Sequence, residues 1–216
     1  MLLRARIFGT SEGYNTQDNL RANMFDSLRK HLEQVIEISD QEFDEFCGLL
    51  SPQKFKKRAI LIRPGDLVQS EFYVVSGCLQ VVHTSENGDE SILQFAIEDW
   101  WVSDFAAFFN GTRARLTVSC IEDSTVLELN KNYLEELYGR IPKFERFFRI
   151  KLTGAFVALY ERIQNGLEKN STERYQEFCE TYPNIEQRVP NYKIASYLGI
   201  KPESLSRIRR ELQEKT

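Results

Sequence analysis

The chain has 216 residues, of which 42% are hydrophobic, 28% charged and 12% aromatic, and its formal net charge is -4. This composition is that of a folded globular protein with one or two domains, and it excludes an intrinsically disordered chain. A charge of -4 argues weakly against a nucleic-acid partner, provided that the charge is evenly distributed.

Hydropathy and cysteine usage together predict a cytoplasmic protein. No stretch approaches the roughly 20 apolar residues of a membrane span, and the N-terminus lacks the apolar run of a secretory signal. The four cysteines are dispersed and form no CxxC pair, which predicts reduced, buried or half-buried thiols and no metal site. These cysteines are Cys47, Cys78, Cys120 and Cys179.

The N-terminal quarter is predicted to be an arm followed by helices. Residues 1–23 are polar and rich in Gly and Asn, which indicates a flexible arm, and Met24 is an alternative natural start. A helical pattern covers 25–50, and within it Ser39 and Glu42 form a capping box that begins a second helix at about residue 43. We expect Pro52 to close this second helix.

From 55 to 129 the hydrophobic pattern has the period of two that is typical of strands. The strands are short and are separated by glycine turns, among which Asn87 and Gly88 give a strong hairpin signal. A short aromatic insert at 100–109 is expected to be helical. The predicted strands cover 56–62, 72–76, 78–83, 91–96, 116–120 and 125–129. This pattern indicates a β-roll or barrel.

A helical period returns after residue 129, first in a short helix at 131–138 and then in a long helix from Pro142 to about Glu168. The long helix carries two adjacent apolar stripes, so it needs two packing partners. One partner is expected to be the chain's own β-domain, and the other the same helix of a second subunit. Burial of both stripes within one chain is the alternative. The predicted dimer interface contains Phe148, Leu152, Ala155, Leu159 and Ile163.

Residues 189–210 have the spacing of a DNA-binding helix-turn-helix. Gly199 stands where the first helix must end in a left-handed cap, and Pro202 stands at the first position of the second helix. An ordinary helical hairpin is the alternative. The inward positions are apolar, namely Ile194, Ala195, Leu198, Ile200, Leu205 and Ile208.

The outward face of the second helix has the residue types that read DNA. Arginine pairs bidentately with guanine, glutamate accepts a hydrogen bond from cytosine, and serine reaches either base edge. The predicted base-reading residues are Glu203, Ser204, Ser206, Arg207 and Arg210. The predicted phosphate-binding residues are Lys193, Lys201 and Arg209. Residues 188–210 hold six basic and one acidic residue, a net charge of +5, which leaves -9 for the rest of the chain. A solvated basic face is the alternative.

These parts, in this order, resemble the Crp/Fnr family of bacterial transcription regulators, and most closely its Bacteroidetes-type branch. The resemblance is carried by RPGD at 63–66, FYVVSG at 72–77, LQV at 79–81, FAIEDWWVSD at 95–104 and IASYLGI at 194–200. It implies an α+β protein with an N-terminal double-stranded β-helix, a jelly-roll sensor domain of the cyclic-nucleotide-binding type. A dimerisation helix and a C-terminal helix-turn-helix domain of winged-helix type would follow. The implied domains cover 24–141, 142–168 and 169–216, and a wing is expected around 184–188.

The resemblance also implies a ligand position, and there the sequence departs from the family. Members that bind cyclic AMP use a Gly-Glu pair for the ribose and an Arg followed by Ser or Thr for the phosphate. Here Ser and Asp replace the pair, and Ala114 and Arg115 stand at the phosphate position. The candidate ligand-binding residues are Ser103, Asp104, Arg113, Arg115, Leu159 and Tyr160. We therefore expect neither a cofactor nor cyclic AMP, and an unknown small-molecule effector remains open.

The sequence thus predicts a homodimeric transcription regulator that binds an inverted repeat in double-stranded DNA. It has no nucleophile–base pair, phosphate loop or histidine-rich cluster that would indicate an enzyme. Contact with RNA polymerase stays open. The alternative is a ligand-sensing or scaffold protein whose C-terminal helices bind protein rather than DNA.

Overall fold

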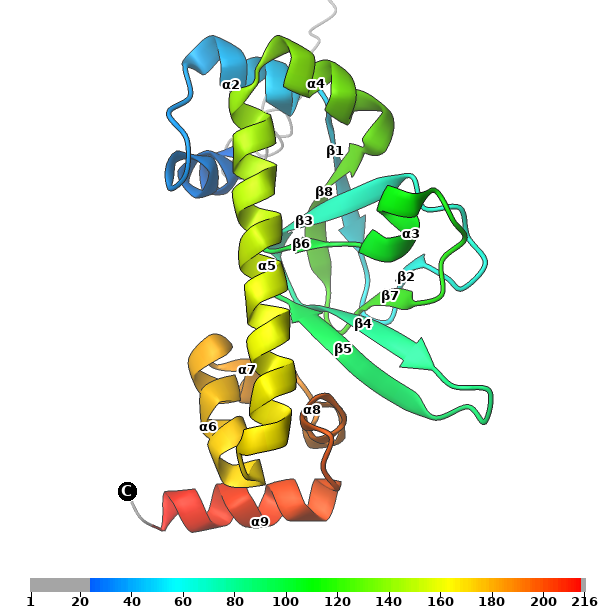
Figure 1. Cartoon of the computed structure of the whole chain (residues 1–216), viewed down its shortest axis with the longest axis vertical. Coiled ribbons are helices and arrows are strands. Elements are labelled where there is room, and N and C mark those ends of the chain that lie inside the picture. Colours follow the sequence, from blue (N-terminus) through cyan, green and yellow to red (C-terminus); the bar gives the residue numbers. More distant parts are fainter. Residues whose placement is uncertain (1–23, 215–216) are drawn as a thin grey trace, which may run out of the picture.

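The computed structural model describes residues 24–214, and it divides into three parts arranged along one long helix (Figure 1). A β-sandwich lies beside the middle of this helix, and a group of short helices surrounds its lower end in the view of Figure 1. The predicted flexible arm, residues 1–23, lies outside the described residues. No helix between residues 24 and 214 combines the length and apolarity needed to cross a bilayer.

The N-terminal helices are shorter than predicted. A helix over 24–33 is followed by α2 (Asp40–Cys47). Ser39 caps α2 with the expected capping box, in which its hydroxyl accepts from the amide of Glu42 and the Glu42 carboxylate accepts from the amide of Ser39. The prediction that helix continues to residue 50 and is closed by Pro52 is wrong. Pro52 lies in the edge strand β1, where a missing donor is tolerated.

Eight strands in the described part form two four-stranded antiparallel sheets, with orders β1-β8-β3-β6 and β2-β7-β4-β5. This arrangement confirms the jelly-roll sensor fold. The strands are β1 (Leu50–Phe55), β2 (Ile60–Ile62), β3 (Ser70–Ser76), β4 (Leu79–Thr84), β5 (Glu90–Ala96), β6 (Trp101–Val102), β7 (Thr117–Cys120) and β8 (Ser124–Asn130).

All six predicted strands are present, although the first is reduced to β2. Gly88 lies at the tip of the β4–β5 hairpin with φ +85°, as its turn position requires. The predicted helical insert is confirmed in part, because β6 precedes the short helix α3 (Phe105–Asn110). Sequence reasoning missed β1, which is polar and contains proline, and β6, which has only two residues.

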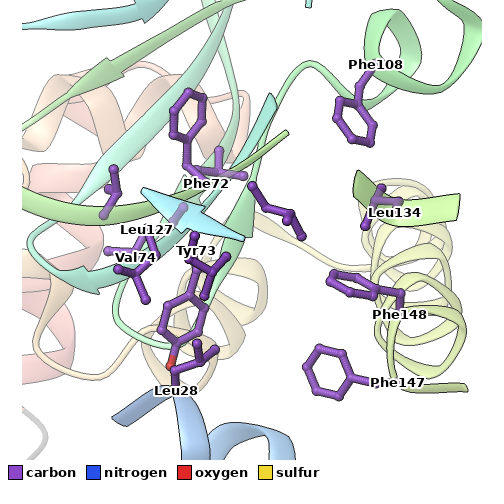
Figure 2. Close-up of a cluster of buried hydrophobic side chains, with 14 of the residues drawn as sticks. Leu28, Phe72, Tyr73, Val74, Phe108, Leu127, Leu134, Phe147 and Phe148 are labelled. Carbon is purple, nitrogen blue, oxygen red and sulfur yellow. The ribbon is translucent and has the colours of Figure 1, made fainter. Parts of the chain in front are cut away.

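The sandwich core extends into the start of the long helix α5 (Lys143–Glu168). The preceding segments are η1 (Lys131–Tyr133) and α4 (Leu134–Arg140), and Leu134 and Leu137 of α4 are buried in the same core. Phe144 and Phe147 are fully buried, and Figure 2 shows Phe147 and Phe148 projecting from α5 toward the cluster that contains Tyr73. The first turns of α5 therefore belong to the sensor domain.

One predicted dimer residue is wrongly assigned. Phe148 is only 7% exposed, and its ring packs at 5.2 Å from Trp101 and 6.0 Å from Tyr138, so it is a core residue of its own chain. The cause is the position of Phe148 in the first two turns, where the sandwich still covers the helix. The other four predicted interface residues are exposed, namely Leu152, Ala155, Leu159 and Ile163.

The C-terminal part contains four helices: α6 (Ser171–Thr181), α7 (Ile185–Arg188), α8 (Asn191–Leu198) and α9 (Pro202–Gln213). We call this part the head. Asn170 caps α6 through a capping box with Glu173. The wing expected around 184–188 is wrong, because this segment forms the helical turn α7. Within 24–214, no strand follows β8.

Candidate nucleic-acid interface

The turn between α8 and α9 has the geometry that the sequence predicts. Gly199 is left-handed with φ +65°, and its amide donates to the carbonyl of Ser196 at 3.2 Å. The amide of Ile200 reaches back to the carbonyl of Ala195 at 3.0 Å, which completes a Schellman cap. Pro202 then begins α9 at its first turn. The turn thus fixes the direction of α9 relative to α8.

The two helices share one apolar core. Ile194 and Ala195 of α8 and Leu205 of α9 are fully buried, Ile208 is 5% exposed, and Leu198 is 7% exposed. These residues form a single cluster with apolar residues of α6 and of the β4–β5 hairpin. The predicted inward face is therefore confirmed, and the opposite face of α9 must point to solvent.

The solvent face of α9 carries most of the predicted base-reading residues. Arg207 keeps 66% of its side chain exposed and makes only a loose ion pair, 3.8 Å long, with Glu211. Such an exposed pair contributes little to stability, so the guanidinium is free to bind. The exposed members of the predicted set are Lys201, Glu203, Ser206, Arg207 and Arg210, whereas Ser204 is half-buried.

Two residues predicted to meet phosphates have partners within the chain instead. The ammonium of Lys193 donates to the side-chain carbonyl of Gln80 in β4 at 2.7 Å, and burial lowers the pKa of Lys193. Arg209 donates to Glu186 at 3.1 Å and to Asn191 at 3.3 Å. In this conformation both side chains are half-buried and already paired, and Lys201 is the one predicted phosphate-binding residue that is exposed.

The basic segment is consequently less basic at its surface than its sequence suggests. Arg188 holds Glu98 and Glu122 of the sensor through bonds of 2.6–3.0 Å. The positive charges of the segment are thus divided between the contact of Arg188 with the sensor and the exposed face of α9. On that face the charged residues are Lys201, Glu203, Arg207, Arg210 and Glu211.

A second polar cluster holds the head helices together. Glu186 of α7 accepts from the hydroxyl of Tyr175 at 3.0 Å and from the thiol of Cys179 at 3.2 Å, in addition to Arg209. Burial, followed by the contact with Glu186, raises the pKa of Cys179 to about 11. The thiol of Cys179 thus takes part in the contact between α6 and α7. All four cysteines are buried or half-buried, as predicted.

The candidate ligand-binding residues do not converge on one cavity. Asp104 is 2% exposed and caps α3 with one oxygen, while its other oxygen accepts from the amides of Arg115 and Leu116 at 2.9 and 3.1 Å. The hydroxyl of Ser103 donates to the carbonyl of Ser70. Both side chains thus have structural roles, which a local sequence comparison does not reveal.

The other four candidates are spread over the surface. Arg113 donates to the carbonyl of Gly65 at 2.7 Å, and the Arg115 side chain is exposed. Leu159 and Tyr160 lie on the exposed part of α5. An open groove of about 1440 Å³ runs between α5, α3 and β5, with Trp100, Trp101, Phe105 and Phe109 among its lining residues. Of the six candidates, only Leu159 lines it.

Comparison with known proteins supports the sensor assignment and relates most of the chain to bacterial regulators. Residues 52–140 match the family model of the cyclic nucleotide-binding domain. The anaerobic regulatory protein of Pasteurella multocida is 24% identical over 192 residues, which cover 82% of this chain and 68% of that protein. Electron transport regulator A of Shewanella oneidensis is also 24% identical, over 82% of this chain and 75% of its own length.

Solved structures share the fold over most of the chain. FixK2 of Bradyrhizobium japonicum superposes with a TM-score of 0.68 at 17% identity, over 77% of this chain and 85% of that one. The global regulator CLP of Xanthomonas campestris gives 0.64 at 16% identity, over 82% and 93%. Residues 52–140 thus match a cyclic nucleotide-binding domain, and most of the chain is similar to these bacterial regulators. Its assignment to the Bacteroidetes-type branch stays a prediction.

At the ligand position of the family that the sequence resembles, the chain departs from the pattern of members that bind cyclic AMP. Asp104 occupies the place of the ribose-binding glutamate, but both of its oxygens already accept backbone hydrogen bonds. The neighbouring Arg115 is exposed rather than turned into a cavity. A buried phosphate needs converging donors, and these residues do not supply them.

Proposed function

We propose that this chain is a homodimeric regulator of the Crp/Fnr type that binds double-stranded DNA through α9 and reads an inverted repeat. The observation that carries the proposal is the exposed face of α9, with Ser206, Arg207 and Arg210 on a helix whose direction is fixed by a Schellman cap. Arg207 and Arg210 can each form two hydrogen bonds with guanine, and Lys201 is placed for a backbone phosphate.

Dimerisation is inferred from the uncovered part of α5. Beyond its first turns this helix exposes a continuous apolar surface, with Leu152 39%, Phe156 67%, Leu159 53%, Ile163 58% and Leu167 85% exposed. Soluble monomers rarely leave such a patch open. A second copy of α5 offers a matching surface, because a twofold interface pairs each patch with itself. The two α9 helices would then meet half-sites about one helical turn, ~34 Å, apart.

The effector of the sensor is left open, and cyclic AMP is not proposed, since Asp104 and Arg115 do not form its site. No enzymatic activity is proposed, because the matched relatives are named as regulators. A cytoplasmic location and a contact with RNA polymerase agree with this function.

Selection from random double-stranded DNA tests the proposal. The full chain should enrich an inverted repeat with one preferred spacing. Arg207→Ala should lose base preference at one position in each half-site, at about 1–3 kcal/mol per site. Arg63→Ala, which removes an exposed arginine of the sensor, is the control and should select the wild-type sequence. Failure to enrich any sequence at low salt would contradict the proposal.

A further inference from the structure

One arginine connects the long helix, the sensor sheet and the head. Arg162 of α5 is half-buried. One terminal nitrogen of its guanidinium donates to the carbonyl of Leu93 at 2.5 Å, and the other to the carbonyls of Tyr197 at 2.9 Å and Ile92 at 3.5 Å. The guanidinium also lies 3.8 Å from the centroid of the Tyr197 ring. The planar guanidinium of Arg162 therefore donates hydrogen bonds to carbonyls of both β5 and α8.

The sensor side of this contact is the free edge of a sheet. β5 is the last strand of its sheet, so its outward amides and carbonyls lack a neighbouring strand. Arg162 supplies donors to two of these carbonyls, and Ser196 of α8 bonds two further backbone groups of β5. Its hydroxyl accepts from the amide of Ile92 and donates to the carbonyl of Glu90, both at 3.2 Å. The head thus forms hydrogen bonds with backbone groups of β5 that a neighbouring strand would otherwise pair.

The head side of the contact is the C-terminus of α8. The last carbonyls of a helix lack intrahelical partners and attract cations. Here the carbonyl of Tyr197 accepts from Arg162, and that of Leu198 accepts from Arg174 at 3.1 Å. Gly199, which sets the direction of α9, follows immediately. Arg162 therefore binds the carbonyl of Tyr197, two residues before the Gly199 cap that sets the direction of α9.

We propose that Arg162 is a positioning residue that sets the orientation of the head, and hence of α9, relative to the sensor and α5. The inference rests on the proposed function. Because α5 is the helix that would pair in the dimer, the orientation of each head determines the distance between the two α9 helices. Arg162 then determines which half-site spacing the dimer accepts. Lysine cannot replace it, since an ammonium lacks the planar fork that spans β5 and α8.

The test uses the full-length protein and two readouts. In the first, hydrogen exchange of the Ile92 amide reports whether Ser196 still covers β5, and it needs no DNA. In the second, binding is measured to one selected half-site and to paired half-sites at several spacings. Arg162→Met removes the donors but keeps a long side chain, and Arg162→Lys keeps only the charge. Arg149→Met, at an exposed position of the same helix, is the control.

Arg162→Met should exchange the Ile92 amide at least tenfold faster and should bind several spacings with similar affinity. Its affinity for a single half-site should stay within about twofold of wild type, which a general loss of folding would not allow. Arg162→Lys should be intermediate, and Arg149→Met should match wild type in both readouts. Unchanged exchange or an unchanged spacing preference in Arg162→Met would overturn the inference. If wild type binds no DNA, the proposed function fails, and the exchange rate alone then decides whether Arg162 holds the head.

Discussion

Arg188 of the head and Glu98 of the sensor form a two-bond ion pair in which both N–O distances are 2.9 Å. Burial raises the pKa of Glu98, but the hydrogen bonds from Arg188 and from the backbone outweigh it, and the net pKa lies below the ordinary value of 4.5. Arg188 also donates to Glu122. This arginine is therefore a joint between the two domains and not part of the DNA-binding face.

Removing the ion pairs of Arg188 should lower the free energy of unfolding at neutral pH. Arg188→Gln leaves two carboxylates without their cation, and because these are partly exposed we expect a loss of only about 1 kcal/mol in unfolding free energy. The depressed pKa of Glu98 stabilises the fold above about pH 4.5, so the difference from wild type should shrink as the pH falls below that value. Urea unfolding at several pH values measures this, with Arg63→Gln as control. A pH-independent difference would contradict the assigned role.

Glu71 should make stability fall as the pH rises. This residue of β3 is 4% exposed, and burial raises its pKa from 4.5 to about 8. Its carboxyl is protonated in the folded protein at pH 7 but ionised in the unfolded chain. The stabilisation is thus present below about pH 4.5 and lost as the pH rises toward 8.

Glu71→Gln, which is neutral at every pH, tests this. Relative to wild type, the variant should gain unfolding free energy between pH 5 and pH 8, on the order of 3 kcal/mol. The exposed Glu37→Gln is the control and should show a constant difference. Equal pH profiles for wild type and Glu71→Gln would show that the carboxyl is not neutral in the fold.

His31 should act in the opposite direction. It is 6% exposed between Tyr73 and Phe147, and burial, with a smaller effect of Lys151, lowers its pKa from 6.5 to about 4. As the pH falls, the unfolded chain therefore takes up the proton on His31 at a higher pH than the folded protein does. The stabilisation from the neutral histidine is thus present above about pH 6.5 and is lost as the pH falls toward 4.

His31→Phe preserves the ring packing and removes the proton site. The decline in unfolding free energy between pH 7 and pH 5 should be smaller by about 2 kcal/mol than in wild type. His83→Phe changes the chain's other histidine, which is exposed on β4, and should leave the decline as it is. If His31→Phe keeps the full decline, the buried histidine does not cause it.

The exposed stripe of α5 should hold the dimer together. Leu159→Asp places a charge on a side chain that is 53% exposed, so the monomer fold is preserved, but a charge buried in a helix pair is costly. We expect a shift from dimer to monomer in sedimentation equilibrium. Leu67→Asp, at a 58% exposed leucine of the sensor, should remain dimeric. A wild-type monomer, or a dimeric Leu159→Asp, would place the interface elsewhere.

Local signals in the sequence were sufficient to predict those elements whose conformation depends on a few neighbouring residues. Gly199 and Pro202 define the helix-turn-helix because a left-handed cap and a first-turn proline depend on a few neighbouring residues. The glycine turns likewise predict the strands of the sandwich. Pro52 is an ambiguous signal, since proline is compatible both with a helix end and with an edge strand.

The roles of several basic residues could not be predicted, because their partners lie far away in the sequence. Lys193 binds Gln80, 113 residues away, and Arg188 binds Glu98, 90 residues away. The spacing of residues within a helix places such a polar side chain on the outer face of the helix. It does not show which residue of another domain the side chain contacts in the folded protein. Phe148 illustrates the same limit for an apolar residue, since periodicity does not tell which turns of α5 the sandwich covers.

The salt dependence of DNA binding tests the central claim most directly. The dimer and its selected inverted repeat are titrated from 50 to 200 mM salt, with wild type, Arg207→Ala and Lys201→Ala. If the head binds DNA, the logarithm of the affinity should fall linearly with the logarithm of the salt concentration. Over this range the affinity should fall by on the order of 10³-fold. Arg207→Ala should lose the preference for the repeat over scrambled DNA, and Lys201→Ala should bind both more weakly with a shallower slope. Equal, salt-independent affinity for repeat and scrambled DNA would contradict the account and favour a head that binds protein.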